Sequence, residues 1–248
     1  MPPLIIAHRG DSAHRPENTL SSFASALELG AELVEMDVQL TRDGVVVVIH
    51  DASVDRTTDG GGRVRDMTLA ELRRLSAGYP LRFGSAFAGE RVPTLAEVLA
   101  LLRERARAMI EIKSESVTGD ADGGIEALSV AAVRRAGMER DAALISFDHR
   151  ALLRCRQLAP EIARGHVFDR GQPGEMLAGA REAACEVVLP HKCLLSDELR
   201  DRAREAGIKV ATWVVDEPEE LRTLARYELF GVGSNRPGVL LESLRDEE

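Results

Sequence analysis

The sequence predicts an α/β fold, specifically a (β/α)8 TIM barrel with a small insertion. Its 248 residues suit one such barrel, which runs to about 250 residues. Eight short apolar runs alternate with longer amphipathic helical patterns from end to end, and this alternation indicates βα units around a parallel sheet. An open doubly wound sheet is the alternative. It would need a glycine-rich nucleotide loop after the first strand, but His8-Arg9-Gly10-Asp11-Ser12 does not fit GxGxxG.

The expected elements follow in order along the chain. An apolar run predicts a strand at 4–7, and a helix is expected from Asn18-Thr19 to Gly30. Further apolar runs predict strands at 33–40, 109–113, 144–147, 163–168, 186–189, 209–213 and 229–234, with a hairpin arm at 45–49. Helical patterns predict helices at 69–75, 94–106, 122–136, 149–158, 174–184, 196–206 and 217–226. The alternation breaks at 52–92, so we expect an insertion there within a single domain spanning 1–248.

Composition argues against several classes of protein. The formal net charge is -9 and no Lys- or Arg-rich run offsets it, which argues against a nucleic-acid-binding protein. No apolar run approaches the roughly 18 residues of a membrane span, and the N-terminus lacks the pattern of an export signal. We therefore expect a cytoplasmic protein without a transmembrane segment. The three cysteines lack CxxC spacing and predict free thiols. Whether the chain forms a homo-oligomer is left open.

Residues 32–51 gather ionisable side chains in one short stretch. Glu35 and Asp37 are two residues apart, so they share one face of an extended strand. Two like charges on a buried face repel each other, and a cation is their expected partner. Asp43-Gly44 predicts a hairpin turn, which would place His50 roughly opposite Asp37. A solvated edge hairpin with an unrelated histidine is the alternative for this stretch alone.

Ionisable residues also end other predicted strands, where a barrel carries its active site. His8 and Arg9 end the first strand, and Glu111 and Lys113 end the strand at 109–113. Together with the acid pair, Glu111 would suit one divalent cation with oxygen ligands, Mg²⁺ or Ca²⁺. Arg9 and Lys113 would then bind a phosphate-like anion, and His8 and His50 can divide general-acid and general-base duties. This set predicts phosphodiester cleavage.

With these residues assembled, the sequence resembles the glycerophosphodiester phosphodiesterase family, a branch of the phosphatidylinositol-phospholipase-C-like superfamily. The resemblance covers nearly the whole chain and rests on the order and spacing of short motifs. The motifs are His8-Arg9-Gly10, Pro16-Glu17-Asn18-Thr19, Glu35-Met36-Asp37, Thr41-Arg42-Asp43-Gly44, His50-Asp51, Asp55-Arg56-Thr57-Thr58, Pro93-Thr94-Leu95, Glu111-Ile112-Lys113, Ser146-Phe147 and Trp213.

The resemblance implies metal-dependent hydrolysis of a small-molecule glycerophosphodiester to sn-glycerol 3-phosphate and an alcohol. It implies His8 and His50 as the catalytic acid/base pair, Glu35, Asp37 and Glu111 as the ligands of one divalent cation, and Arg9 and Lys113 as the phosphate-binding residues. Glu17 would organise Arg9 or a catalytic histidine, while Phe147 and Trp213 would line the substrate pocket. Two alternatives are a lysophospholipase D or sphingomyelinase D-like enzyme, which would favour a larger apolar surface near the insertion, and a catalytically inactive phosphodiester-binding barrel.

Three residues depart from the family's pattern. Phe230 and Asn235 stand where the family's final strand region carries acidic residues. Asp216 stands where the family often has an Asn after Trp-x-Val. We expect Phe230 and Asn235 to make the pocket wall at the final strand less polar, and we expect the departures to alter substrate preference and not to abolish activity.

Overall fold

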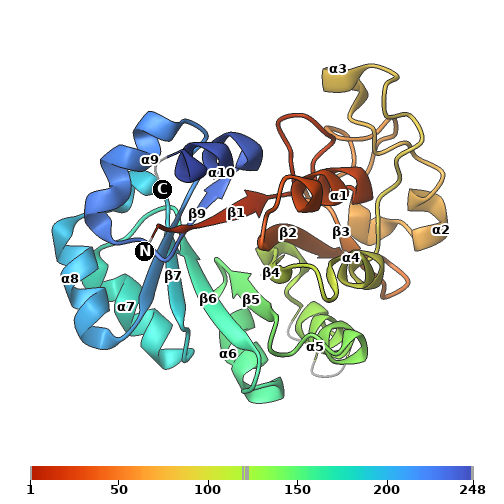
Figure 1. Ribbon diagram of the computed structural model, residues 1–248. Coiled ribbons are helices and arrows are strands. Elements are labelled where there is room, and N and C mark those ends of the chain that lie inside the picture. The colour runs from red at the N-terminus through yellow and green to blue at the C-terminus, as the bar shows by residue number, and fades with distance from the viewer. Residues whose placement is uncertain (1, 119, 121–122, 247–248) are drawn as a thin grey trace.

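The computed structural model describes residues 2–118, 120 and 123–246, and within them eight parallel strands close into a barrel (Figure 1). The ring runs β1-β2-β4-β5-β6-β7-β8-β9, and β9 pairs with β1 to close it. The predicted (β/α)8 TIM barrel is therefore confirmed. The strands are β1 (Leu4–His8), β2 (Leu33–Leu40), β4 (Arg107–Ile112), β5 (Ala142–Ser146), β6 (Ala163–Phe168), β7 (Val187–Pro190), β8 (Lys209–Trp213) and β9 (Gly231–Ser234).

The hairpin arm is the short strand β3 (Val46–Val48), which lies outside the ring. It pairs antiparallel with the end of β2, so that Val38 faces Val48. In the turn, Gly44 has a φ of 75°, a conformation that glycine adopts without steric penalty. The hairpin that Asp43-Gly44 predicted is therefore present.

Helices surround the barrel (Figure 1). They are α1 (Leu20–Glu28), α4 (Leu95–Leu102), α5 (Ile125–Ala136), α6 (His149–Leu158), α7 (Pro173–Glu182), α8 (Asp197–Ala206), α9 (Pro218–Leu224) and α10 (Pro237–Arg245). Thr94 and Glu97 form a capping box that begins α4, which ends earlier than the predicted residue 106 because Arg103 has left the helical conformation. Helix α10 was not predicted, since Pro237-Gly238 is more typical of a turn; here the proline occupies the first turn of the helix.

Alternation along the strands divides their side chains into two layers. On β2, Val34, Met36 and Val38 point outward and are fully buried in a cluster with residues of α1 and α4. Glu35 and Asp37 point into the barrel instead. The apolar part of the barrel interior has these buried members: Ile6, Leu33, Met109, Ile145, Val167, Val187, Leu189 and Ala211. The acidic pair therefore lies beside an apolar barrel interior.

Residues 52–92, called the insertion segment below, lie between β3 and α4 and are largely irregular. They hold a 3-10 turn at Val64–Asp66 and the one-turn helices α2 (Leu69–Leu72) and α3 (Pro80–Phe83). The segment has its own apolar cluster, which it shares with Val47 and Ile49 of the hairpin arm. The tip of α3 exposes Leu81, whose relative exposure is 83%. No helix in the described residues is long and apolar enough to cross a membrane.

Candidate active site

A cavity opens at the C-terminal ends of the barrel strands, where the sequence predicted the active site. Its ionisable lining consists of His8, Arg9, Glu35, His50, Glu111 and Lys113. Its floor and wall are apolar and include Ile145, Val167, Leu189, Phe147 and Trp213. Asp37 lies directly behind this lining and is 1% exposed. The structure thus brings the predicted site residues together around one cavity.

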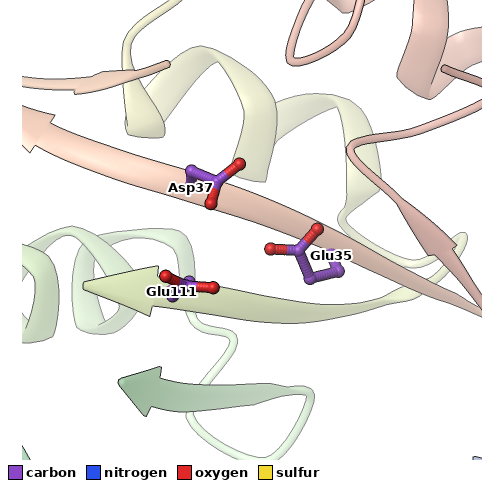
Figure 2. Close-up of side chains that lie close together, drawn as sticks. All are labelled: Glu35, Asp37 and Glu111. Atoms are coloured by element: carbon purple, nitrogen blue, oxygen red, sulfur yellow. The ribbon is translucent and has the colours of Figure 1, made fainter. Parts of the chain in front are cut away.

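Three carboxylates converge from two neighbouring strands (Figure 2). Glu35 and Asp37 come from β2 and Glu111 from β4, where Asp37 and Glu111 are direct register partners. One oxygen from each carboxylate lies within 4.8 Å of the other two, and all three residues are buried. The parallel pairing of β2 with β4 is what places the third carboxylate beside the first two.

Burial and mutual repulsion shift the acidities of this cluster. Burial raises the pKa of Glu111 to about 7, with a further contribution from the charge of Asp37. Burial together with Asp37 and Glu111 also raises the pKa of Glu35 well above its usual value. Burial alone would raise the pKa of Asp37 too, but Arg9 and Lys113 outweigh it and hold that pKa below its usual range. Asp37 therefore carries its charge while its two neighbours lack sufficient positive compensation.

Two cations contact the carboxylates. The Nζ atom of Lys113 lies 2.6 Å from Glu111 Oε1 and 3.3 Å from Asp37 Oδ1. The Nε atom of Arg9 lies 3.1 Å from Asp37 Oδ2, and the backbone N–H of Arg9 donates to Glu35 Oε2 at 3.0 Å. Arg9 has a φ of 59°, the left-handed conformation that non-glycine residues seldom adopt. This turn at the end of β1 lets its backbone and its side chain reach different carboxylates.

His8 ends β1, and its ring is held by a hydrogen bond to Asn235. Its Nδ1 pairs with Asn235 Oδ1 at 2.8 Å, and its Nε2 lies 4.0 Å from Glu35 Oε2. Burial and the neighbouring Arg9 lower the pKa of His8 to about 4. Asn235 follows β9 and binds in turn to Asp216, which follows β8. One ring nitrogen is therefore held by the amide of Asn235, and the other is turned toward the carboxylates.

His50 follows the hairpin arm and lines the same cavity. The backbone N–H of Ile49 donates to the carbonyl of Asp37, so His50 is one residue past the position opposite Asp37. Its Nδ1 pairs with Asp51 Oδ1 at 2.6 Å. Burial lowers the pKa of His50 below its usual value, although Asp37 and the bond to Asp51 oppose the shift. The two histidines thus have different partners, an amide for His8 and a carboxylate for His50.

Arg56, from the insertion segment, links the two sides of the cavity. Its Nε donates to Asp51 Oδ2 at 2.7 Å, while its Nη1 and Nη2 donate to the two oxygens of Glu17 at 2.8 Å. Glu17 also accepts from Arg9 Nη1 at 2.9 Å. Glu17 therefore contacts Arg9, as expected. Sequence analysis did not place Asp51 or Arg56 in the site, although both lie in the matched motifs, because an irregular segment has no periodicity from which to read side-chain direction.

Aromatic side chains form one wall of the cavity. Phe147 and Trp213 meet edge to face with ring centroids 5.8 Å apart, and the indole N–H donates to the carbonyl of Leu189 at 2.9 Å. The expectation that Phe230 makes this wall less polar is wrong. Phe230 precedes β9, so it lies at the N-terminal end of the barrel, where Lys209 covers its ring at 4.6 Å.

The arrangement combines three kinds of chemistry in one small space. Clustered carboxylates with raised pKa values can accept a cation, and Arg9 and Lys113 can donate to an anion beside it. Two imidazoles of different surroundings flank that position. An apolar floor beneath them excludes water and strengthens each electrostatic contact.

Comparisons with known proteins agree with this geometry. The sequence matches the model of the Glycerophosphoryl diester phosphodiesterase family over residues 8–239. It is 38% identical over 248 residues to a glycerophosphodiester phosphodiesterase of Caldanaerobacter subterraneus subsp. tengcongensis, covering 99% of each chain. Among solved structures, it is similar to an Oleispira antarctica phosphodiesterase in complex with the product sn-glycerol-3-phosphate, with a TM-score of 0.89, 30% identity and coverage of 98% and 97%. A glycerophosphodiester phosphodiesterase from Agrobacterium tumefaciens gives a TM-score of 0.83, with 29% identity and coverage of 97% and 99%.

Proposed function

Because the chain belongs to the Glycerophosphoryl diester phosphodiesterase family, we propose that it hydrolyses glycerophosphodiesters to sn-glycerol 3-phosphate and an alcohol with the help of one divalent cation. The observation that carries this proposal is the convergence of three buried carboxylates beside Arg9 and Lys113. An anionic substrate would not approach such an acidic cluster without added positive charge.

The donor set fits Mg²⁺ or Ca²⁺. Glu35, Asp37 and Glu111 offer only oxygen ligands, as these hard cations prefer, and two of the three have raised pKa values for want of positive charge. They would hold the ion, which would stabilise negative charge on the non-bridging oxygens of the phosphate. Glu17 and Asp51 also belong to the connected group of charges. When all are ionised, five carboxylates face three cations among the described residues, which leaves two negative charges.

The chain's own residues would perform the binding and proton transfers. Arg9 and Lys113 already point their donors into the cluster, so they would bind the phosphate oxygens. His8 and His50 both line the cavity and have different hydrogen-bond partners, which suits removal of a proton from the nucleophile by one and delivery of a proton to the leaving alcohol by the other. Phe147 and Trp213 would cover the organic part of the substrate. Attack by water and attack by a substrate hydroxyl through a cyclic phosphate both fit this layout.

The proposal is tested by assaying glycerol 3-phosphate release from a panel of glycerophosphodiesters with different head groups. We expect product from at least one, loss of activity in EDTA, and recovery with Mg²⁺ or Ca²⁺. Full activity after exhaustive chelation would remove the metal from the mechanism. Absence of glycerol 3-phosphate over the whole panel would overturn the assigned reaction.

The histidine roles have a direct test. His8→Ala and His50→Ala should each lower kcat by about 10² or more while the protein stays folded. The matched control is His14→Ala, because the side chain of His14 is 59% exposed and its ring pairs with the carboxylate of Asp11, which does not line the cavity. Near-parental kcat in both site variants would refute the acid/base assignment.

A second candidate function rests on the exposed tip of α3. Leu81 is the most exposed large hydrophobic residue described, and Arg56, which binds Asp51 and Glu17, lies over the ring of Tyr79, two residues earlier. An acyl chain in contact with Leu81 would favour a lysophospholipid, and so a lysophospholipase D-like activity. Release of choline from lysophosphatidylcholine, lowered by Leu81→Ser, would support it. Turnover of water-soluble diesters alone would exclude it.

We also propose that residues 1–248 act as one domain in the cytoplasm. The three cysteines are free, which suits a reducing compartment. Size-exclusion chromatography and limited proteolysis would test the domain assignment: a stable fragment that ends within the insertion segment would contradict it.

A further inference from the structure

Asn235 lies between His8 and Asp216 and binds both. Its Oδ1 is 2.8 Å from His8 Nδ1, and its Nδ2 donates to Asp216 Oδ2 at 3.0 Å. The other oxygen of Asp216 accepts the backbone N–H of Asn235 at 2.7 Å and the hydroxyl of Ser234 at 3.1 Å. Asp216 follows β8, so a residue remote from the cavity lining is joined to the histidine through one amide.

The order of donors and acceptors in this chain has only one consistent solution. An ionised carboxylate can only accept hydrogen bonds, so the NH₂ group of Asn235 must face Asp216. The amide oxygen then faces His8, and because it can only accept, the proton of the neutral imidazole must sit on Nδ1. The lone pair of the ring is therefore on Nε2, the nitrogen that faces Glu35 and the cavity.

We propose that Asp216 is a positioning residue that fixes the tautomer and the orientation of His8 through the amide of Asn235. The two orientations of an amide have nearly the same shape, so packing does not select between them. The Ser12 hydroxyl, 3.0 Å from Asn235 Oδ1, does not select either, because a hydroxyl can donate to the amide oxygen or accept from the NH₂ group. Without the carboxylate, the NH₂ group can turn to His8 and donate to Nδ1, which moves the ring proton to Nε2 and leaves no lone pair toward the substrate. This inference rests on the proposed role of His8 in proton transfer.

The structure suggests a variant pair that separates positioning from simple structural loss. Asp216→Asn removes the charge that orients the amide. The double exchange Asp216→Asn with Asn235→Asp keeps the shape and the total charge, and it leaves a partner for every donor. In the exchange, the new carboxylate at 235 accepts from His8 Nδ1, while the new amide at 216 donates to it and accepts from the backbone N–H of residue 235 and from Ser234.

We expect Asp216→Asn to lower kcat by about tenfold or more with KM within about twofold, because the histidine acts in the chemical step. The double exchange should restore kcat to within about threefold of the parent. Ser234→Ala is the matched control, since it removes one hydrogen bond from Asp216 without touching the amide, and its kcat should stay parental. An Asp216→Asn variant with parental kcat, or a folded double exchange no faster than the single variant, would overturn the proposal.

A second readout does not depend on activity. The ¹⁵N chemical shifts of the His8 ring distinguish the two neutral tautomers. The parent and the double exchange should carry the proton on Nδ1, and Asp216→Asn should shift it at least partly to Nε2. An unchanged tautomer in Asp216→Asn overturns this inference alone, whereas parental turnover in His8→Ala overturns the proposed function of His8.

Discussion

Glu111→Gln should stabilise the metal-free protein while removing its response to metal. Burial raises the pKa of Glu111 from 4.5 to about 7 in the folded state. A raised folded pKa gives stability that is fully present below the unfolded value and is lost as pH rises through the folded value. The shift corresponds to about 3 kcal/mol at pH 8, where the carboxylate is ionised in both states. Glutamine keeps the shape and the acceptor for Lys113 but avoids that cost.

Thermal unfolding in EDTA measures this effect. At pH 8 we expect the midpoint of Glu111→Gln to lie about 6–12 °C above that of the parent, from about 2–4 °C per kcal/mol for a chain of this size. At pH 4, which lies below both the folded and the unfolded pKa of Glu111, the two midpoints should nearly coincide. Addition of Mg²⁺ or Ca²⁺ should raise the parent's midpoint at pH 8 and leave that of the variant almost unchanged. A lower midpoint for the variant at pH 8, or equal stabilisation of both proteins by metal, would refute the reasoning.

Two further expectations concern other parts of the molecule. Arg56→Lys keeps the charge but loses the planar guanidinium fork that binds Asp51 and Glu17, so kcat/KM should fall about tenfold, as for one lost charge-assisted hydrogen bond. Arg73→Lys, at an exposed ion pair of the same segment, should have no effect on kcat/KM. Equal effects of the two substitutions would contradict the role of Arg56. Of the three thiols, Cys193 is exposed, while burial raises the pKa of Cys155 to about 12 and that of Cys185 to about 11. A thiol reagent at pH 8 should therefore modify one cysteine per folded chain quickly, and two fast reactions would argue against this burial.

Strand alternation and parallel pairing were sufficient to predict the barrel and those site residues that lie on its strands. Strand alternation decides that Glu35 and Asp37 share a face, and parallel register decides that Glu111 joins them. The hairpin turn placed His50 correctly to within one residue. These residues lie in regular elements, where direction follows from sequence spacing.

Sequence reasoning failed where side-chain direction depends on tertiary contacts. Arg56 reaches Asp51 and Glu17 from an irregular segment that no period describes. Phe230 was expected in the pocket wall, but it lies at the start of the last strand, just before β9 begins at Gly231, and the start of a barrel strand lies at the end of the barrel away from the cavity. Asn235 and Asp216 were treated as unrelated departures, yet they are hydrogen-bonded partners from adjacent strand ends. A contact between two loops leaves no trace in the spacing of either one.

The apolar cluster shared by the hairpin arm and the insertion segment means that the two histidines proposed for proton transfer follow residues of different apolar clusters. His8 ends β1, whose Ile6 packs in the barrel interior, whereas His50 directly follows Ile49 and Arg56 lies two residues after Val54, both members of the smaller cluster. A displacement of the smaller cluster relative to the barrel would misalign the two histidines while both apolar clusters stayed packed. We therefore expect activity to report such a displacement more sensitively than spectroscopic measures of folding do.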